Sequence, residues 1–227
     1  MKKRTTFSVV PWYFTIPSLI GLALILGPLL GLLYNIPWMG LHEIIDEEVV
    51  GATQLSLVTA SISTLICGVI GAPLALTLCK VLDRSRLRGA GSLLYAIIYT
   101  PIIFSPVVSG LGLLFFWGRK GIIGTALYDA GIKITFTTTA VIIAQVFVAL
   151  PFFVASAVTT LQAIPREYEE IAEVEGAKAS EIIYRVLLPL AAPGIATGFL
   201  LSFARALGEF GATVTFAGNV QGKTETI

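Results

Sequence analysis

The sequence predicts an all-α protein, a polytopic bundle of helices in a membrane. Two observations favour this fold class: an unusually apolar composition, and five apolar stretches that are each long enough to span a bilayer. Of the 227 residues, 56% are hydrophobic and 13% are charged, and the mean hydropathy is +0.87. Soluble domains carry about 25% charged residues, and a soluble globule of this size could not bury so much apolar surface. A bilayer is therefore the expected solvent.

The five expected spans cover residues 16–34, 55–78, 93–117, 136–161 and 190–207. A membrane-spanning helix needs about 20 mostly apolar residues, and each stretch approaches or exceeds that length. The first four contain proline, so we expect kinked helices that pack against one another. The first stretch is expected to be retained rather than cleaved as a signal peptide, because no small-residue cleavage site follows it.

Lysine and arginine predict a cytoplasmic amino terminus, since cytoplasmic loops carry an excess of both residues. With this orientation ten of them lie inside and four outside, although Arg119 and Lys120 oppose it locally. The inner ten are Lys2, Lys3, Arg4, Lys80, Arg84, Arg86, Arg88, Arg166, Lys178 and Arg185; the outer four are Arg119, Lys120, Lys133 and Lys223. Five spans then leave the carboxyl terminus outside.

Composition also argues against several other functions. A formal net charge of +1 gives no field suited to nucleic acid. The cysteines Cys67 and Cys79 lie in one apolar stretch and predict neither a disulfide framework nor a metal site, and His42 is the single histidine. An intramembrane enzyme would need convergent catalytic groups or metal ligands within the spans, and the spans contain no such cluster.

The longest cytoplasmic loop, residues 162–189, is rich in helix-forming and acidic residues. Pro165 is placed to open a helix, and the three glutamates that follow it closely would interact favourably with the helix dipole. Gly176 is expected to break this helix, and a second helix is expected from Ser180. Two interpretations remain open: a charged connector that keeps the helix ends hydrated, or a rigid element that docks in a groove of another protein.

The spacing within this loop resembles the EAA loop of ABC importer permeases. Glu170-Ile171-Ala172 is followed after three residues by Gly176, and after nine more by a Val-Leu-Leu-Pro segment that ends at Pro189. The family pattern has Ala where Ile171 stands and Ile where Val186 stands. Residues 106–110 and 202–212 are also similar to segments of molybdate permeases, and sulfate permeases share much of the second segment.

The resemblance implies a single transmembrane domain over residues 1–227, with 162–189 as the coupling loop. It implies a permease that pairs with a second copy, docks two ATP-hydrolysing subunits and receives an oxyanion from an extracytoplasmic binding protein, in the cell membrane of a prokaryote. Molybdate or tungstate is the expected ion, with sulfate or another solute as the alternative. The expected coupling residues are Arg166, Glu169, Glu170, Ala172, Gly176 and Pro189.

The same resemblance implies that this chain is not an enzyme and binds no cofactor, with ATP and magnesium held by the partner subunit. Residues 218–224 nearly match the phosphate-binding loop, but Ala217 stands where that motif requires glycine. We interpret the near match as a coincidence. Family members normally continue into another span, so the chain is expected to stop short of a sixth helix. A passive channel or secondary carrier is a further alternative, and it would need no docking loop.

Arg205 and Glu209 are the ionisable residues at the end of the fifth expected span. Ionisable groups at membrane depth usually face a polar interior, and a spacing of four puts both on one helix face if the helix continues past Gly208. They form either a self-neutralising pair near the outer interface or, together with Ser109, the lining of an anion route.

Hydroxyl residues within the spans have a simpler expected use. Ser61, Ser63, Thr64 and the threonines at 137–139 are expected to bond to the preceding helical turn or to hold neighbouring helices together. Gly194 and Gly198 predict a close approach of two helices, within one subunit or between two.

Overall fold

The computed structural model describes residues 11–38, 47–83, 88–218 and 224, and the secondary structure of these residues is helical. The chain divides into two compact units, Met1–Asp46 and Glu47–Ile227. The first unit contains the 3-10 turn η1 (Trp12–Phe14) and helix α1 (Thr15–Asn35), and the helices of the second unit are α3 (Glu47–Asp83), α4 (Arg88–Ile103), α5 (Pro106–Trp117), α6 (Gly124–Asp129), α7 (Thr138–Gln162), α8 (Glu167–Val174), α9 (Ala179–Ile182), the π-helix η4 (Ile183–Leu187), α10 (Leu188–Leu207) and α11 (Gly211–Ala217).

Helix α1 is apolar along its whole length, and none of its residues is buried within the unit. The prediction of a first span is confirmed, because Trp12–Asn35 is long and apolar enough to cross a membrane. Such exposure of leucine and isoleucine is stable in lipid and costly in water.

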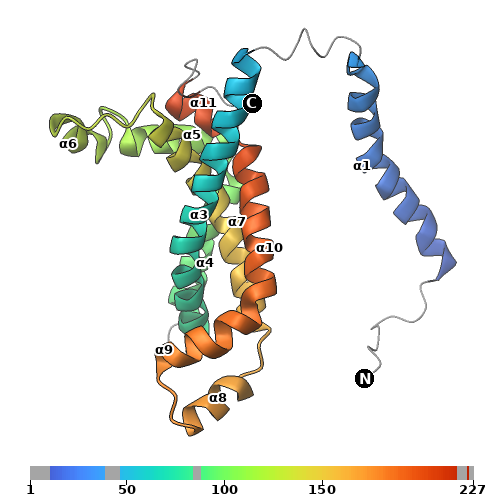
Figure 1. Cartoon of the computed structure of the whole chain (residues 1–227), viewed down its shortest axis with the longest axis vertical. Helices are drawn as coiled ribbons and strands as arrows, with labels where there is room; N and C mark the ends of the chain where they lie inside the picture. The colour runs from blue at the N-terminus through green and yellow to red at the C-terminus, as the bar shows by residue number, and fades with distance from the viewer. Residues whose placement is uncertain (1–10, 39–46, 84–87, 219–223, 225–227) are drawn as a thin grey trace. The chain divides into compact units, whose positions relative to one another are not determined.

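The second unit is built on three long helices, α3, α7 and α10, which pack side by side (Figure 1). Helix α7 is the central one. In its most apolar stretch of 18 residues, 56% of the residues are buried, against 39% in the span Glu47–Val81 and 17% in the span Ala179–Leu207. Phe153 of α7 is fully buried and meets the ring of Phe199 of α10 edge to face. Three of the five expected spans are thus confirmed here, at slightly different ends.

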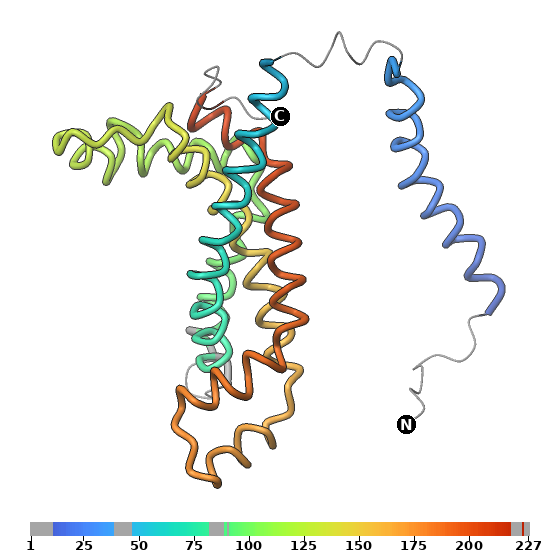
Figure 2. Tube along the Cα trace, viewed as in Figure 1, coloured from blue at the N-terminus to red at the C-terminus, as the bar shows by residue number. Residues whose placement is uncertain are grey.

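The third expected span, residues 93–117, is present as a sharply bent pair of helices, α4 and α5, rather than as one continuous helix. Figure 2 shows the chain turning sharply between α4 and α5, which are bent by 115°. Pro106 has no N–H for the preceding turn and disfavours helical geometry at Ser105, where ψ is 151°. Ser105 then caps α5 by accepting the N–H of Val108 at 3.4 Å. Among the described residues, four helices can cross a membrane, or five if this bent pair counts as one span.

A buried polar cluster joins α3 to α7. The side-chain amide of Gln145 donates to the hydroxyl of Thr59 at 3.2 Å, and its oxygen accepts the hydroxyl of Ser63 at 2.9 Å. The hydroxyls of Ser61 and Thr64 instead donate to carbonyls one turn earlier in α3. Both uses expected for the hydroxyl residues are therefore found.

The two ends of this unit differ in character. Helices α8 and α9 extend the bundle at one end, whereas α5, α6 and α11 lie at the other (Figure 1). Helix α11 packs against α5, where a Cβ on Gly110 would come within 2.6 Å of Thr215 Cβ and a Cβ on Gly211 within 2.5 Å of Pro106 Cβ.

Candidate functional site: a coupling hairpin and an ion pair

Helix α8 presents both acidic and apolar side chains to solvent. Glu167, Glu169 and Glu170 occupy its first turn, as expected, and there they interact favourably with the unpaired N–H groups of the helix. Tyr168, Ile171 and Val174 are 50%, 63% and 86% exposed. Their spacing of three places them on one side of the helix. An exposed apolar stripe beside carboxylates is typical of a docking surface, which a mere hydrated connector does not need.

Gly176 ends this helix, as predicted. Its φ is +83°, which glycine adopts at little cost and other residues rarely adopt. The N–H of Gly176 donates to the carbonyl of Glu173, and the N–H of Ala177 donates to the carbonyl of Ala172, both at 3.0 Å. This pair of bonds is the Schellman arrangement, so Ala172 supplies an acceptor that closes the turn. No other atom lies within 4 Å of a Cβ built on Gly176.

The second helix of the loop starts at Ala179, close to the expected Ser180, but it changes geometry after one turn. The carboxylate of Glu181 accepts the backbone N–H of Lys178 at 3.0 Å. Residues 183–187 then form a π-helix, in which the N–H of Leu188 donates to the carbonyl of Ile183. Pro189 has no N–H to donate to the carbonyl of Arg185, which favours this local shift of hydrogen bonds. The residue pattern of this segment does not by itself predict a π-helix.

The structure brings most of the expected coupling residues together in this hairpin. Arg166 is the N-cap residue of α8, Glu169 and Glu170 are exposed in the first turn, and Ala172 and Gly176 form the closing turn. Pro189 lies apart from them, in the first turn of α10. It is connected to α8 through α9 and η4, and η4 itself contacts α8.

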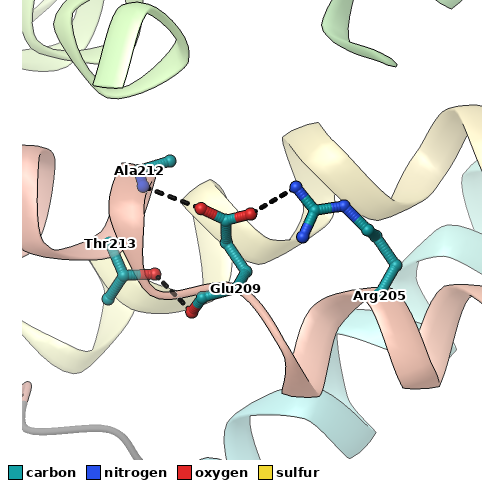
Figure 3. A network of polar contacts seen from close by, with 4 residues as sticks. All are labelled: Arg205, Glu209, Ala212 and Thr213. Atoms are coloured by element: carbon teal, nitrogen blue, oxygen red, sulfur yellow. Dashed lines mark hydrogen bonds and ion pairs between the residues drawn. The ribbon is translucent and has the colours of Figure 1, made fainter. Parts of the chain in front are cut away.

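Arg205 and Glu209 form an ion pair at the opposite end of the bundle, 2.5 Å between Nη2 and Oε2 (Figure 3). Helix α10 ends at Leu207, so the helix does not continue past Gly208. The pair forms nonetheless, because the N–H groups of Gly208 and Glu209 still bond to carbonyls of the last helical turn. The backbone therefore continues to turn for two residues beyond the helix, which brings the side chain of Glu209 next to that of Arg205.

Glu209 is more than a partner for Arg205. Its side chain is 1% exposed, whereas that of Arg205 is 29% exposed. The other carboxylate oxygen, Oε1, accepts the N–H of Ala212 at 2.7 Å in the first turn of α11, and the backbone carbonyl accepts the hydroxyl of Thr213 at 3.5 Å (Figure 3). Sequence analysis missed these two contacts, since nothing in the local pattern indicates where α11 begins.

Ser109 is buried on α5, and its hydroxyl has no hydrogen-bond partner among the residues that the structure describes. It makes no hydrogen bond to Arg205 or Glu209, so the three expected route residues do not form one cluster. Ser109 belongs to the helix that packs on α11, the helix that Glu209 caps.

Nothing in the described residues indicates a metal centre, since they contain no group of three or more metal-ligating side chains. In the near match to a phosphate-binding loop, Gly218 follows helix α11 rather than a strand, and residues 219–223 lie outside the described ones. The structural context that the motif requires, a strand before the loop, is therefore not found.

A family model and the curated relatives place this chain in one family. Residues 68–224 match the family described as binding-protein-dependent transport system inner membrane component. The chain is 41% identical to the molybdenum transport system permease protein ModB of Mycobacterium tuberculosis over 96% of its length and 81% of that protein. It is 36% identical to ModB of Escherichia coli over 78% of the chain and 75% of the relative.

The sulfate transport system permease protein CysT of Escherichia coli is 35% identical over 90% of this chain and 72% of that protein. Among solved structures, a chain of a bacterial alginate ABC transporter crystallised with its alginate-bound periplasmic protein matches with a TM-score of 0.55 at 18% identity, covering 90% and 92% of the two chains. That likeness supports the fold alone. With its apolar helices, this chain is a multi-pass protein of the cell membrane, and it belongs to the family of binding-protein-dependent transport system inner membrane components.

Proposed function

We propose that this chain is the membrane-spanning permease subunit of an ATP-driven ABC importer that carries molybdate, or the similar ion tungstate, into the cytoplasm. The relatives named for molybdenum transport support the substrate. The observation that supports the mechanism is the exposed hairpin α8–Gly176–α9 at one end of the bundle, which we interpret as a docking element. In this proposal the chain holds no cofactor, and ATP and magnesium bind to a partner subunit.

The hairpin is proposed to dock an ATPase subunit on the cytoplasmic side. The amino terminus is proposed to lie on the same side, as the distribution of lysine and arginine predicts. Its exposed stripe, Tyr168, Ile171 and Val174, offers apolar area to a groove, and Glu170 pairs with a cation of that groove. Arg166 and Glu169 flank this contact. Motion of the hairpin then reaches α10 through η4 and Pro189, and alternates the access of the bundle between the two sides.

The proposed assembly contains a second copy of this chain, two ATPase subunits and an extracytoplasmic protein that binds the oxyanion. The family that this chain matches is described as binding-protein-dependent, which supports a delivering protein outside. At the end of the bundle opposite the hairpin, Arg205 with Glu209 is proposed to border the anion route, and Ser109 to lie beside it on α5.

Co-purification tests the docking role. The chain and its ATPase subunit are co-expressed, and the ATPase retained per permease is measured for the wild type, Glu170→Gln and Gly176→Val. Both variants are expected to lose most of the ATPase. Glu48 is another exposed glutamate, in the first turn of α3 at the other end of the bundle. Glu48→Gln is therefore the matched control and is expected to retain the ATPase. If both hairpin variants retain as much ATPase as the wild type, the result would favour a passive channel or carrier.

Sulfate is the second candidate substrate, and the similarity to a sulfate permease over 90% of the chain supports it. Uptake of labelled molybdate into cells is measured with unlabelled tungstate or sulfate in excess. Competition by tungstate and not by sulfate supports the first proposal, and the reverse order supports the second. Arg205→Ala is expected to lower uptake while the ATPase still co-purifies, and unchanged uptake would remove Arg205 from the route.

A further inference from the structure

The Arg205–Glu209 pair is asymmetric in a way that an ordinary surface pair is not. In the exposed pair Arg185–Glu181 the closest atoms are 3.7 Å apart and both side chains are accessible, at 79% and 41%. In the Arg205–Glu209 pair, by contrast, the side chain of Glu209 is 1% exposed and that of Arg205 is 29% exposed. The molecule thus buries the negative charge and presents the positive one.

The exposed guanidinium retains capacity for an anion. Arginine has five N–H donors in a planar fork that suits oxyanions, and among the described residues its one partner is Glu209. An oxyanion could therefore approach the open side of Arg205. The carboxylate of Glu209 lies 2.5 Å from the guanidinium, so its negative charge offsets much of the attraction that Arg205 exerts on an anion. The anion would therefore meet a dipole rather than a net positive charge.

Glu209 is held in this position by the backbone. Its Oε1 accepts the N–H of Ala212 at 2.7 Å, and the burial of its side chain prevents water from screening the charge. The carboxylate therefore has two separable properties: it closes the turn into α11, and it neutralises Arg205. An amide of the same shape keeps the first property and removes the second.

We propose that Glu209 is a specificity-determining residue that keeps the oxyanion affinity of Arg205 low, so that a dianion can pass the site without being trapped. This inference rests on the proposed placement of Arg205 beside the anion route. A transport site must release its ion on every cycle, and an unneutralised arginine would hold a dianion more tightly than a neutralised one. Glu209 weakens this attraction because its carboxylate pairs directly with the guanidinium of Arg205.

The test measures equilibrium binding of molybdate to the purified permease–ATPase assembly without the binding protein, and uptake of molybdate in proteoliposomes with it. Glu209→Gln is expected to bind molybdate about tenfold more tightly, since the ion now meets an unneutralised guanidinium, and to transport it more slowly. Arg205→Gln is expected to lose both binding and uptake. Perrhenate, a tetrahedral oxyanion with one charge, should gain much less affinity than molybdate in Glu209→Gln.

The outcomes separate this inference from the proposed function. Unchanged or weaker molybdate binding by Glu209→Gln, or an equal gain for perrhenate, overturns the charge-cancelling role, even if Arg205→Gln still abolishes uptake. If Arg205→Gln alters neither binding nor uptake, both the inference and the placement of Arg205 fall, while the docking result at Glu170 is unaffected. Should Glu209→Gln fail to assemble, Glu209→Asp withdraws the carboxylate by one methylene, and it should tighten molybdate binding by a smaller factor.

Discussion

Ser156 of α7 donates its hydroxyl to the backbone carbonyl of Gly194 of α10 at 2.7 Å, so the two helices touch at a glycine. A Cβ at position 194 would lie 1.7 Å from Thr160 Oγ1 and 2.4 Å from Thr160 Cβ. The small-residue pair Gly194 and Gly198 therefore serves packing within one subunit, which settles a point that the sequence left open.

Gly194→Ala is expected to destabilise the bundle by about 1–3 kcal/mol, because α10 must move away from α7 to admit the methyl group. The free energy of unfolding is measured in detergent. Gly198→Ala should cost less, since its Cβ would lie 3.2 Å from Phe153. Gly112→Ala, with open space around it, is the control and should be neutral or slightly stabilising. Equal losses for Gly194→Ala and Gly112→Ala would contradict the packing argument.

Gln145→Leu is expected to cost about 1 kcal/mol, a common value for polar contacts between membrane helices. The cost stays modest because the hydroxyls of Ser63 and Thr59 keep backbone acceptors when the amide is removed. The same unfolding assay measures it. Gln162→Leu, the same change at an exposed position of α7, is the matched control and should have little effect. A more stable Gln145→Leu variant would show that the buried amide does not strengthen the contact between α3 and α7.

Replacement of Gly176 should depend on backbone preference rather than on side-chain size, because the space around it is open. Asparagine tolerates the left-handed region better than a β-branched residue does, for which the cost is about 1–2 kcal/mol. Gly176→Asn should therefore bind the ATPase subunit better than Gly176→Val, and its hairpin should resist limited proteolysis longer. If both variants lose the ATPase equally, the shape of the turn is not what matters.

Pro189→Ala restores an N–H that can bond to the carbonyl of Arg185, and it is expected to convert the π-helix toward an ordinary α-helix. The hairpin surface remains intact, so the ATPase should still co-purify, while more ATP is hydrolysed for each ion carried. Pro193→Ala, which removes a proline from the same helix beyond the π segment, is the matched control. Unchanged coupling in Pro189→Ala would show that the π segment does not transmit motion.

Local sequence rules were sufficient for some elements and not for others. The break at Gly176 followed from one residue that favours a left-handed turn, and the acidic first turn of α8 followed from proline and glutamate positions. The sharp bend within the third span was not expected, because hydropathy counts apolar residues and does not indicate where the chain turns. Residues 93–117 are apolar throughout, yet Pro106 and the Ser105 cap turn the chain by 115° between them.

The hydroxyl and amide groups illustrate a second limit. A serine in an apolar span can bond to its own helix or to a neighbour, and the sequence is compatible with both. Ser61 takes the first option and Ser63 the second, because Ser63 faces Gln145 across the contact of α3 with α7. Only the packing of two helices distant in sequence decides between them.

The order of residues alone determined that this chain is helical, that it belongs in lipid, and that an acidic hairpin lies between two of its apolar stretches. These properties depend on composition and on short-range spacing, which a linear chain already contains. Tertiary structure decided which face of each helix is buried, how α5 departs from α4, and how Glu209 reaches both Arg205 and the start of α11. Those contacts depend on where the backbone turns in three dimensions, and side chains a few residues apart meet or miss according to that turn.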